Sequence, residues 1–126
     1  MAKTEKRHIG DWGEQIAIGH LQKLGYKIIN RNYLTRHGEL DIIAWHKKPH
    51  HGQTLCFVEV KTRRYNDGAA ERATGASKVR HLMHAARQYC LARSMNVDAT
   101  PIQFEQVSVY GTPGEATTVT LYTIPV

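Results

Sequence analysis

The sequence predicts a single α/β domain in which a helix, three strands, a second helix and two further strands follow one another. The chain has 126 residues, which suits one domain and is long enough to bury a core. Two segments show the apolar spacing of helices, and five shorter segments are rich in apolar and β-branched residues. Polar turns separate these segments, with no repeat or low-complexity linker. One domain is therefore expected over residues 1–126, with residues 1–9 as a flexible N-terminus.

The two helices are predicted from an apolar stripe and a stop signal. The first runs from about Gly10 to Leu24, and Gly25 ends it, as glycine commonly does just past a helix. The second runs from about Ser77 to Ser94 and is largely basic outside its apolar stripe. That stripe consists of Val79, Leu82, Met83, Ala86 and Cys90.

The five strands are predicted from β-rich segments between polar turns. The first three are YKIINRNYLT, GELDIIAWH and TLCFVEVKT, and the turn KKPHHGQ separates the second from the third. The final two, IQFEQVSVY and TTVTLYTI, are joined by GTPGEA, which is typical of a hairpin. This order alone does not determine which strands run parallel.

The composition is that of a globular protein with a basic surplus. Apolar residues make up 41% and charged residues 22%, which argues against a disordered chain. The net charge of +6 favours an anionic partner, most often nucleic acid, although a protein can be basic without one. Cys56 and Cys90 lack zinc-site spacing and are expected to be buried, reduced thiols. No signal peptide or membrane span is recognisable, so we expect a cytoplasmic protein without a membrane partner.

Carboxylates interrupt the strand GELDIIAWH, where apolar residues would be expected. Because side chains alternate across a strand, Glu39, Asp41 and Ile43 are predicted to share one face. Leu40 and Ile42 would then share the opposite face. The polar face of this strand needs an environment that tolerates charge.

The strand TLCFVEVKT carries a similar polar stretch. Alternation places Phe57, Glu59 and Lys61 on one face. If the two strands pair with their polar faces aligned, Asp41 meets Glu59 and Lys61. Two carboxylates and an ammonium would then converge at one point of the sheet.

Glu14 brings a third carboxylate from the first helix. Its neighbours on the helix face are apolar: Ala17, Ile18 and Leu21. An unpaired charge beside an apolar stripe is costly, so Glu14 needs a partner there. A metal ion, Lys61 or an arginine would serve.

Clustered carboxylates favour a hard divalent cation, because they raise one another's pKa unless a cation neutralises them. Asp41, Glu59 and Glu14 are thus candidate ligands for Mg²⁺ or Mn²⁺, with water and phosphate oxygens completing the shell. Such an ion activates water at a phosphodiester, and Lys61 could orient that water. Two structural alternatives stay open at this point: Lys61 neutralises Asp41 or Glu59 in an internal ion network, or Glu39 and Glu59 face solvent.

Asp41 followed by Glu59-Val60-Lys61 resembles the PD-(D/E)xK motif of restriction-endonuclease-like nucleases, with Glu39-Leu40-Asp41 lacking the proline. More specifically, the chain resembles the YraN-like family, uncharacterised bacterial proteins similar to archaeal Holliday junction resolvases. The matching segments cover most of residues 10–92. They are GDWGEQIAIGHLQKLGYKIINRNY, GELDIIA, FVEVKTR and SKVRHLMHAARQYC.

The resemblance implies a restriction-endonuclease-like core, in which a central mixed sheet is flanked by helices. It implies a catalytic site of Glu14, Asp41, Glu59 and Lys61 that holds a divalent metal and hydrolyses DNA, which in the resolvases is branched. It also implies a homodimer, because resolvases match the two-fold symmetry of a junction. One departure is Phe104-Glu105, where family members usually carry Phe-Asp.

Several basic and aromatic residues are candidates for nucleic-acid contacts. The loop after the third strand and the start of the second helix supply the residues expected to hold phosphates: Arg63, Arg64, Lys78 and Arg80. Trp12 and Trp45 could stack on bases, but core packing is the competing interpretation. His46, His50 and His51 form a cluster that is more typical of a solvated turn than of a metal site.

Three functions are consistent with these patterns. The leading hypothesis is a metal-dependent nuclease that acts on DNA. The second is a nucleic-acid-binding protein of the same fold without robust catalysis. The third is an interaction protein in which the acids and Lys61 form a buried ion network.

Overall fold

The computed structural model describes residues 3–66, 68, 70 and 75–126. Helix α1 spans Lys3–Lys23 and helix α3 spans Ala76–Ala92. The strands follow the predicted order and are β1 (Lys27–Thr35), β2 (Gly38–Lys48), β3 (Gly52–Arg63), β4 (Ile102–Tyr110) and β5 (Thr118–Thr123). Among the described residues, no helix is long and apolar enough to cross a membrane.

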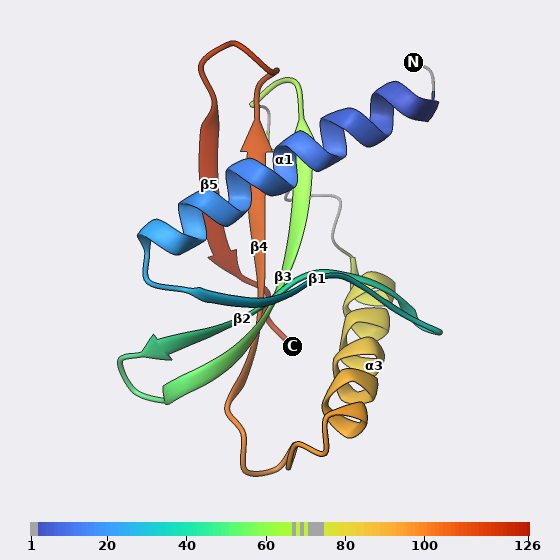
Figure 1. The fold of residues 1–126 in the computed structure, drawn as a ribbon, viewed down its shortest axis with the longest axis vertical. Helices are drawn as coiled ribbons and strands as arrows, with labels where there is room; N and C mark the ends of the chain where they lie inside the picture. Colours follow the sequence, from blue (N-terminus) through green and yellow to red (C-terminus); the bar gives the residue numbers. More distant parts are fainter. Residues whose placement is uncertain (1–2, 67, 69, 71–74) are drawn as a thin grey trace.

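The strands form one mixed sheet in the order β1-β2-β3-β4-β5. Strands β1, β2 and β3 form an antiparallel meander, and β5 returns antiparallel to β4. Strands β3 and β4 are parallel, so the chain between them must cross over, and α3 lies in that crossover. The mixed five-stranded sheet with two helices confirms the predicted α/β fold and is consistent with a restriction-endonuclease-like core (Figure 1).

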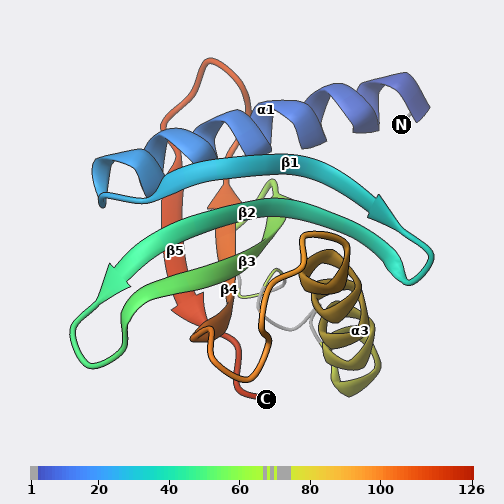
Figure 2. The same ribbon diagram turned by 60° about the horizontal axis from the view of Figure 1, so that its bottom comes forward.

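Each face of the sheet is covered by one helix (Figures 1 and 2). Ala17 and Leu21 of α1 are fully buried against one face, which includes Ile42, Ala44, Cys56, Val58, Val107 and Val109. Leu82, Ala86 and Tyr89 of α3 are buried against the other face, which includes Leu40, Ile43, Leu55, Phe57 and Phe104. Both predicted thiols, Cys56 and Cys90, are free and buried.

Two sequence-based expectations need correction. Helix α1 begins at Lys3 rather than near Gly10, so most of residues 1–9 extend the helix; their flexibility stays a prediction. The predicted alternation in β2 is also wrong at one point, because Leu40 packs on the α3 side together with Ile43, whereas Ile42 packs on the α1 side. The physical reason is that β2 leaves its pairing with β3 next to Asp41, where the regular pleat is lost.

Candidate functional site

The sheet forks where β2 and β3 separate. Their ladder ends at the pair Ile42–Val58. Beyond it, residues 38–40 of β2 pair only with β1, while residues 59–63 of β3 continue with β4. Figure 1 shows the β1–β2 pair and the β3–β4 pair running in different directions from this point, with α1 crossing nearby. Strand ends that diverge inside a covered sheet leave room for side chains between them.

Asp41 occupies this fork. Its Oδ2 accepts a hydrogen bond of 2.9 Å from the backbone N–H of Val60, and this bond replaces strand pairing at the first position after the ladder. Burial and, second, the nearby Glu59 carboxylate raise the pKa of Asp41 from its ordinary value of 3.8 to about 7, although the Val60 bond acts in the opposite direction. The ionised form of Asp41 therefore lacks sufficient positive charge around it.

Glu14 reaches the fork because α1 approaches β3 closely at the preceding residue. A Cβ on Gly13 would lie 2.0 Å from Thr62 Oγ1, so only glycine permits this separation of helix and strand. Glu14 is buried, and burial raises the pKa of its carboxyl against the lowering effects of Asn32 and Arg31. The nearest arginine atom, Arg31 Nη2, is 3.8 Å from Glu14 Oε1, which is a weak contact.

Glu39 joins Glu14 and Asp41, and Asn32 links two of these acids. One oxygen from each of the three carboxylates lies within 4.8 Å of the others. Asn32 Nδ2 donates to both oxygens of Glu14 at 3.0 Å and to Glu39 Oε1 at 2.9 Å. Asn32 has a φ of +48°, a left-handed conformation that asparagine tolerates better than most residues. Sequence reasoning missed Asn32, and an Asn within a strand pattern was the available signal.

Glu59 lies on the other side of the fork and is held by two lysines. Its side chain is almost completely buried, at 3% exposure. Its Oε1 contacts Lys61 Nζ at 3.2 Å and Lys78 Nζ at 3.1 Å. Its Oε2 is buried without a hydrogen-bond partner among the described residues. The alternative that Glu39 and Glu59 face solvent is therefore wrong for Glu59 but right for Glu39, which is exposed. The predicted pairing of Lys61 with a carboxylate is present.

The residues at the fork fit a hard divalent cation. Three carboxylates within 4.8 Å supply the oxygen ligands that Mg²⁺ and Mn²⁺ prefer. Glu59 Oε2 adds a buried acceptor without a partner among the described residues, and burial together with the nearby Glu59 charge raises the pKa of Asp41. Glu14 and Asp41, both predicted ligands, belong to the group of three, and the third member is Glu39 rather than Glu59.

A groove of about 680 Å³ adjoins the acids. Its lining includes Glu14 and Asp41 together with four cationic residues and the turn at 111–113. The cationic residues are Lys6, Lys61, Arg63 and Arg64. Arg63 and Arg64 thus line the same groove as two of the acids, and their contact with phosphate stays a prediction. Lys78 instead contacts Glu59, and Arg80 is exposed on α3 outside this lining.

The histidines and tryptophans lie away from the acids. His46 Nε2 is 2.9 Å from the carbonyl of Leu24, and its ring stacks on Tyr26 at 3.9 Å. His50 and His51 are exposed in the β2–β3 turn. Trp12 packs against the α1-side core and Trp45 against the α3-side core, in agreement with the packing interpretation.

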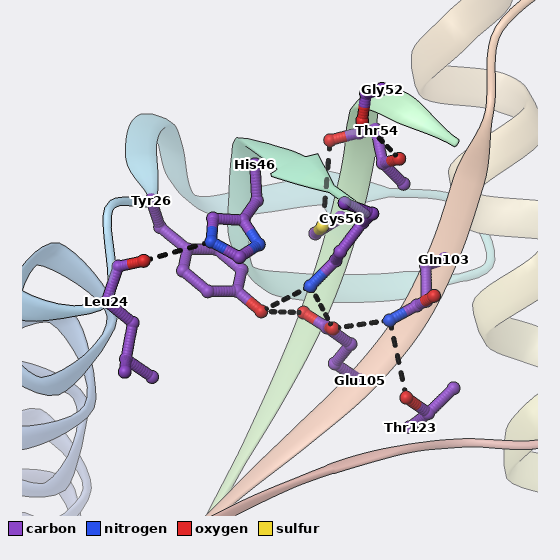
Figure 3. Close-up of polar contacts among 10 residues, drawn as sticks. Leu24, Tyr26, His46, Gly52, Thr54, Cys56, Gln103, Glu105 and Thr123 are labelled. Atoms are coloured by element: carbon purple, nitrogen blue, oxygen red, sulfur yellow. Dashed lines mark hydrogen bonds and ion pairs between the residues drawn. The ribbon is translucent and has the colours of Figure 1, made fainter. Parts of the chain in front are cut away.

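Glu105, the departure from the family pattern, belongs to a separate polar network (Figure 3). It accepts hydrogen bonds from Tyr26 Oη at 2.8 Å, Lys48 Nζ at 2.8 Å and Gln103 Nε2 at 2.6 Å. Burial, and then the bond to Glu105, raise the pKa of Tyr26. Burial, followed by the charge of Glu105, raises the pKa of Cys56 to about 12, so this thiol is unreactive. The network shares no lining residue with the groove and fits a structural role.

Comparison with known proteins shows that the chain is similar to proteins of one bacterial family. The model of the uncharacterised protein family UPF0102 matches residues 13–109. A UPF0102 protein from Syntrophotalea carbinolica is 42% identical over 83% of this chain and 80% of its own length. A UPF0102 protein from Caldicellulosiruptor saccharolyticus is 40% identical over 83% and 84% of the two chains. A third, from Caldanaerobacter subterraneus, is 35% identical over 93% and 91%.

Proposed function

The chain belongs to the uncharacterised UPF0102 family, the YraN-like family of restriction-endonuclease-like proteins. We propose that it is a cytoplasmic, divalent-metal-dependent nuclease that hydrolyses phosphodiester bonds of branched or otherwise structured DNA. The observation that supports this most is the carboxylate group at the fork. Glu14, Glu39 and Asp41 converge from α1 and β2, and a cationic groove opens beside them. Metal-assisted phosphodiester hydrolysis needs carboxylates that hold a cation and a nearby surface that attracts phosphate. Both features occur here.

Mg²⁺ or Mn²⁺ would be held by Asp41, Glu14 and Glu39, with Glu59 as a further acceptor through Oε2. A bound ion of this kind neutralises charge on the phosphodiester and lowers the pKa of a water molecule. Asp41 loses its proton when a cation is bound, since a nearby positive charge favours the ionised carboxylate. The Val60 N–H keeps Oδ2 of Asp41 in a fixed position and leaves Oδ1 for ligation.

The two lysines at Glu59 have different proposed roles. Lys61 follows Glu59 by two residues on the same strand, lines the groove and can orient a water molecule there. Lys78 comes from α3, lies outside the groove lining and holds the same oxygen of Glu59. With Lys61 and Lys78 both on Oε1, the second oxygen of Glu59 is left as the ligand atom.

The decisive experiment is cleavage of branched, single-stranded and duplex DNA during titration with Mn²⁺ or Mg²⁺. Asp41→Ala and Lys61→Ala should both abolish cleavage, while Asp98→Ala, which removes an exposed acid far from the fork, should leave it unchanged. Circular dichroism shows whether each variant is folded. Cleavage that survives Asp41→Ala would refute the proposed site.

A nucleic-acid-binding protein without robust catalysis is the second candidate. The observation in its favour is that Lys61 and Lys78 already neutralise Glu59, which reduces the charge available to a metal. Tight, salt-sensitive DNA binding with no cleavage under either metal would support this candidate. The homodimer that the resemblance implies is likewise a proposal, which light scattering of the free protein and of its DNA complex can test.

A further inference from the structure

An exposed tyrosine stands directly after the cationic residues of the groove. Tyr65 is 69% exposed, and the guanidinium of Arg64 lies 5.7 Å from its ring centre. Arg64 itself lines the groove. Large aromatic side chains gain from burial, so an exposed ring beside a cation is well suited to stacking on a flat ligand.

Of the four cationic residues that line the groove, only Lys61 has a carboxylate partner in the described part of the chain. Among the residues that the structure describes, neither Lys6, Arg63 nor Arg64 forms a salt bridge. Arg63 Nη1 donates to the backbone carbonyl of Thr62 at 2.8 Å, which orients its guanidinium without cancelling its charge. These cations come from α1 and from the end of β3, so positive charge reaches the groove from more than one element.

The volume and lining of the groove indicate the size of ligand that it can hold. It is bounded by α1, by the end of β3 and by the turn at 111–113. Its volume of about 680 Å³ is within the range that encloses a small molecule. One or two nucleotides of a single strand fit such a space, whereas a double helix is too thick to enter it. In a duplex, moreover, the base faces are stacked on one another and are not available to Tyr65.

We propose that this groove takes an unpaired, single-stranded stretch of nucleic acid, with the phosphates at Lys6, Arg63 and Arg64 and one base stacked on Tyr65. Because it names the substrate form of the proposed nuclease, this inference rests on that function. A single strand meets all three features, since its backbone carries the charge, its bases are exposed and its width suits the groove. Within a branched DNA, the unpaired segment at the branch would be the part that enters.

Binding is measured without catalysis, so that it can fail or succeed independently of cleavage. A fluorescein-labelled 12-nucleotide strand of G+C-rich sequence without self-complementarity, and the blunt duplex that it forms with its complement, are titrated in EDTA, with fluorescence anisotropy as the signal. Loss of stacking on one base lowers affinity by roughly 5- to 100-fold. We expect the single strand to bind tighter than the duplex by about this factor, and Tyr65→Ala to remove the difference while Tyr65→Phe retains it.

Matched variants separate stacking from charge. Leu34→Ala changes another exposed apolar residue, 78% exposed at the β1–β2 turn, and should not alter binding. Arg64→Ala should reduce the dependence of log affinity on log salt by about one unit, whereas Lys27→Ala, an exposed lysine outside the groove, should not.

Equal binding of duplex and single strand, or unchanged binding by Tyr65→Ala, would overturn the inference. A preserved single-strand preference with no cleavage under Mn²⁺ would refute only the nuclease function. Cleavage of DNA without a single-strand preference would refute only the groove proposal.

Discussion

Replacing Gly13 by alanine tests the close approach that brings Glu14 to the fork. The added Cβ would lie 2.0 Å from Thr62 Oγ1 and 3.1 and 3.2 Å from Thr62 Cβ and Cγ2. A rotation of the Thr62 side chain moves Oγ1 away but leaves its Cβ in place, because Thr62 is fixed by pairing of β3 with β4 at Val109. Helix and strand must therefore separate by a few tenths of an ångström.

Two effects of opposite sign determine how much Gly13→Ala changes the free energy of unfolding. Alanine in place of glycine within a helix stabilises a protein by up to about 1 kcal/mol. Overpacking of a well-packed contact costs about 1–3 kcal/mol. We therefore expect Gly13→Ala to lower the free energy of unfolding by about 1 kcal/mol net, and to weaken Mn²⁺ binding because Glu14 is the next residue along the displaced helix.

The matched control is Gly19→Ala in the same helix, where no atom lies within 4 Å of the added Cβ. It should raise the free energy of unfolding by up to about 1 kcal/mol, since only the helix propensity changes. Urea denaturation of metal-free protein measures both variants, and calorimetric titration measures Mn²⁺ affinity. The double variant Gly13→Ala/Thr62→Ala lacks Oγ1 and Cγ2 but keeps the Cβ at 3.1 Å, so it should recover only part of the loss. If Gly13→Ala is as stabilising as Gly19→Ala, α1 does not approach β3 as described.

Three further predictions concern charge. Asn32→Gly keeps the left-handed backbone but removes the amide that donates to Glu14 and Glu39. In urea denaturation of metal-free protein, the free energy of unfolding should therefore fall by about 1 kcal/mol, and saturating Mn²⁺ should restore it. Because folding raises the pKa of Asp41 from 3.8 to about 7, the folded state holds that proton more tightly than the unfolded chain, and the associated stability is lost as pH rises through about 7. Asp41→Asn should therefore be more stable than wild type at pH 8, equal to it near pH 4, and unable to bind Mn²⁺; a stability difference independent of pH would contradict the assignment. Lys48→Met leaves Glu105 buried with one charge partner fewer, which should cost about 3 kcal/mol in the same denaturation assay but leave Mn²⁺ affinity unchanged.

The order of elements could be predicted because each has a local signal. Apolar spacing, Gly25 and polar turns determined all seven elements to within a few residues, except for the start of α1. The extra turns from Lys3 carry little apolar periodicity, and no local pattern distinguishes them from a charged tail. The direction of β4 relative to β3 depends on the crossover and was not predicted, because the family resemblance implied a mixed sheet without specifying which strands are parallel.

The sequence predicts acids for the candidate site but not how those acids are arranged in space. Alternation assumes a continuous ladder, and the ladder between β2 and β3 ends next to Asp41. The grouping of Glu39 with Glu14 and Asp41 follows from this fork and not from spacing along either strand. Likewise, the contact of Lys78 with Glu59 depends on how α3 docks on the sheet, which no sequence pattern of α3 specifies.

The partners of the acids distinguish a metal site from a buried ion network. A network that exists for stability pairs each buried carboxylate with a cation, because an unpaired buried charge is costly. Glu59 meets that description through Lys61 and Lys78. Asp41 and Glu14 do not: Asp41 accepts from a backbone N–H, and Glu14 accepts from the Asn32 amide with its nearest arginine atom only at 3.8 Å. Glu39 accepts from the same amide but is exposed, so the cost of an unpaired buried charge does not apply to it. Neutral donors hold carboxylates in position without cancelling their charge. An ion network thus accounts for Glu59 alone, and the cation proposed above would supply the positive charge that Glu14 and Asp41 lack.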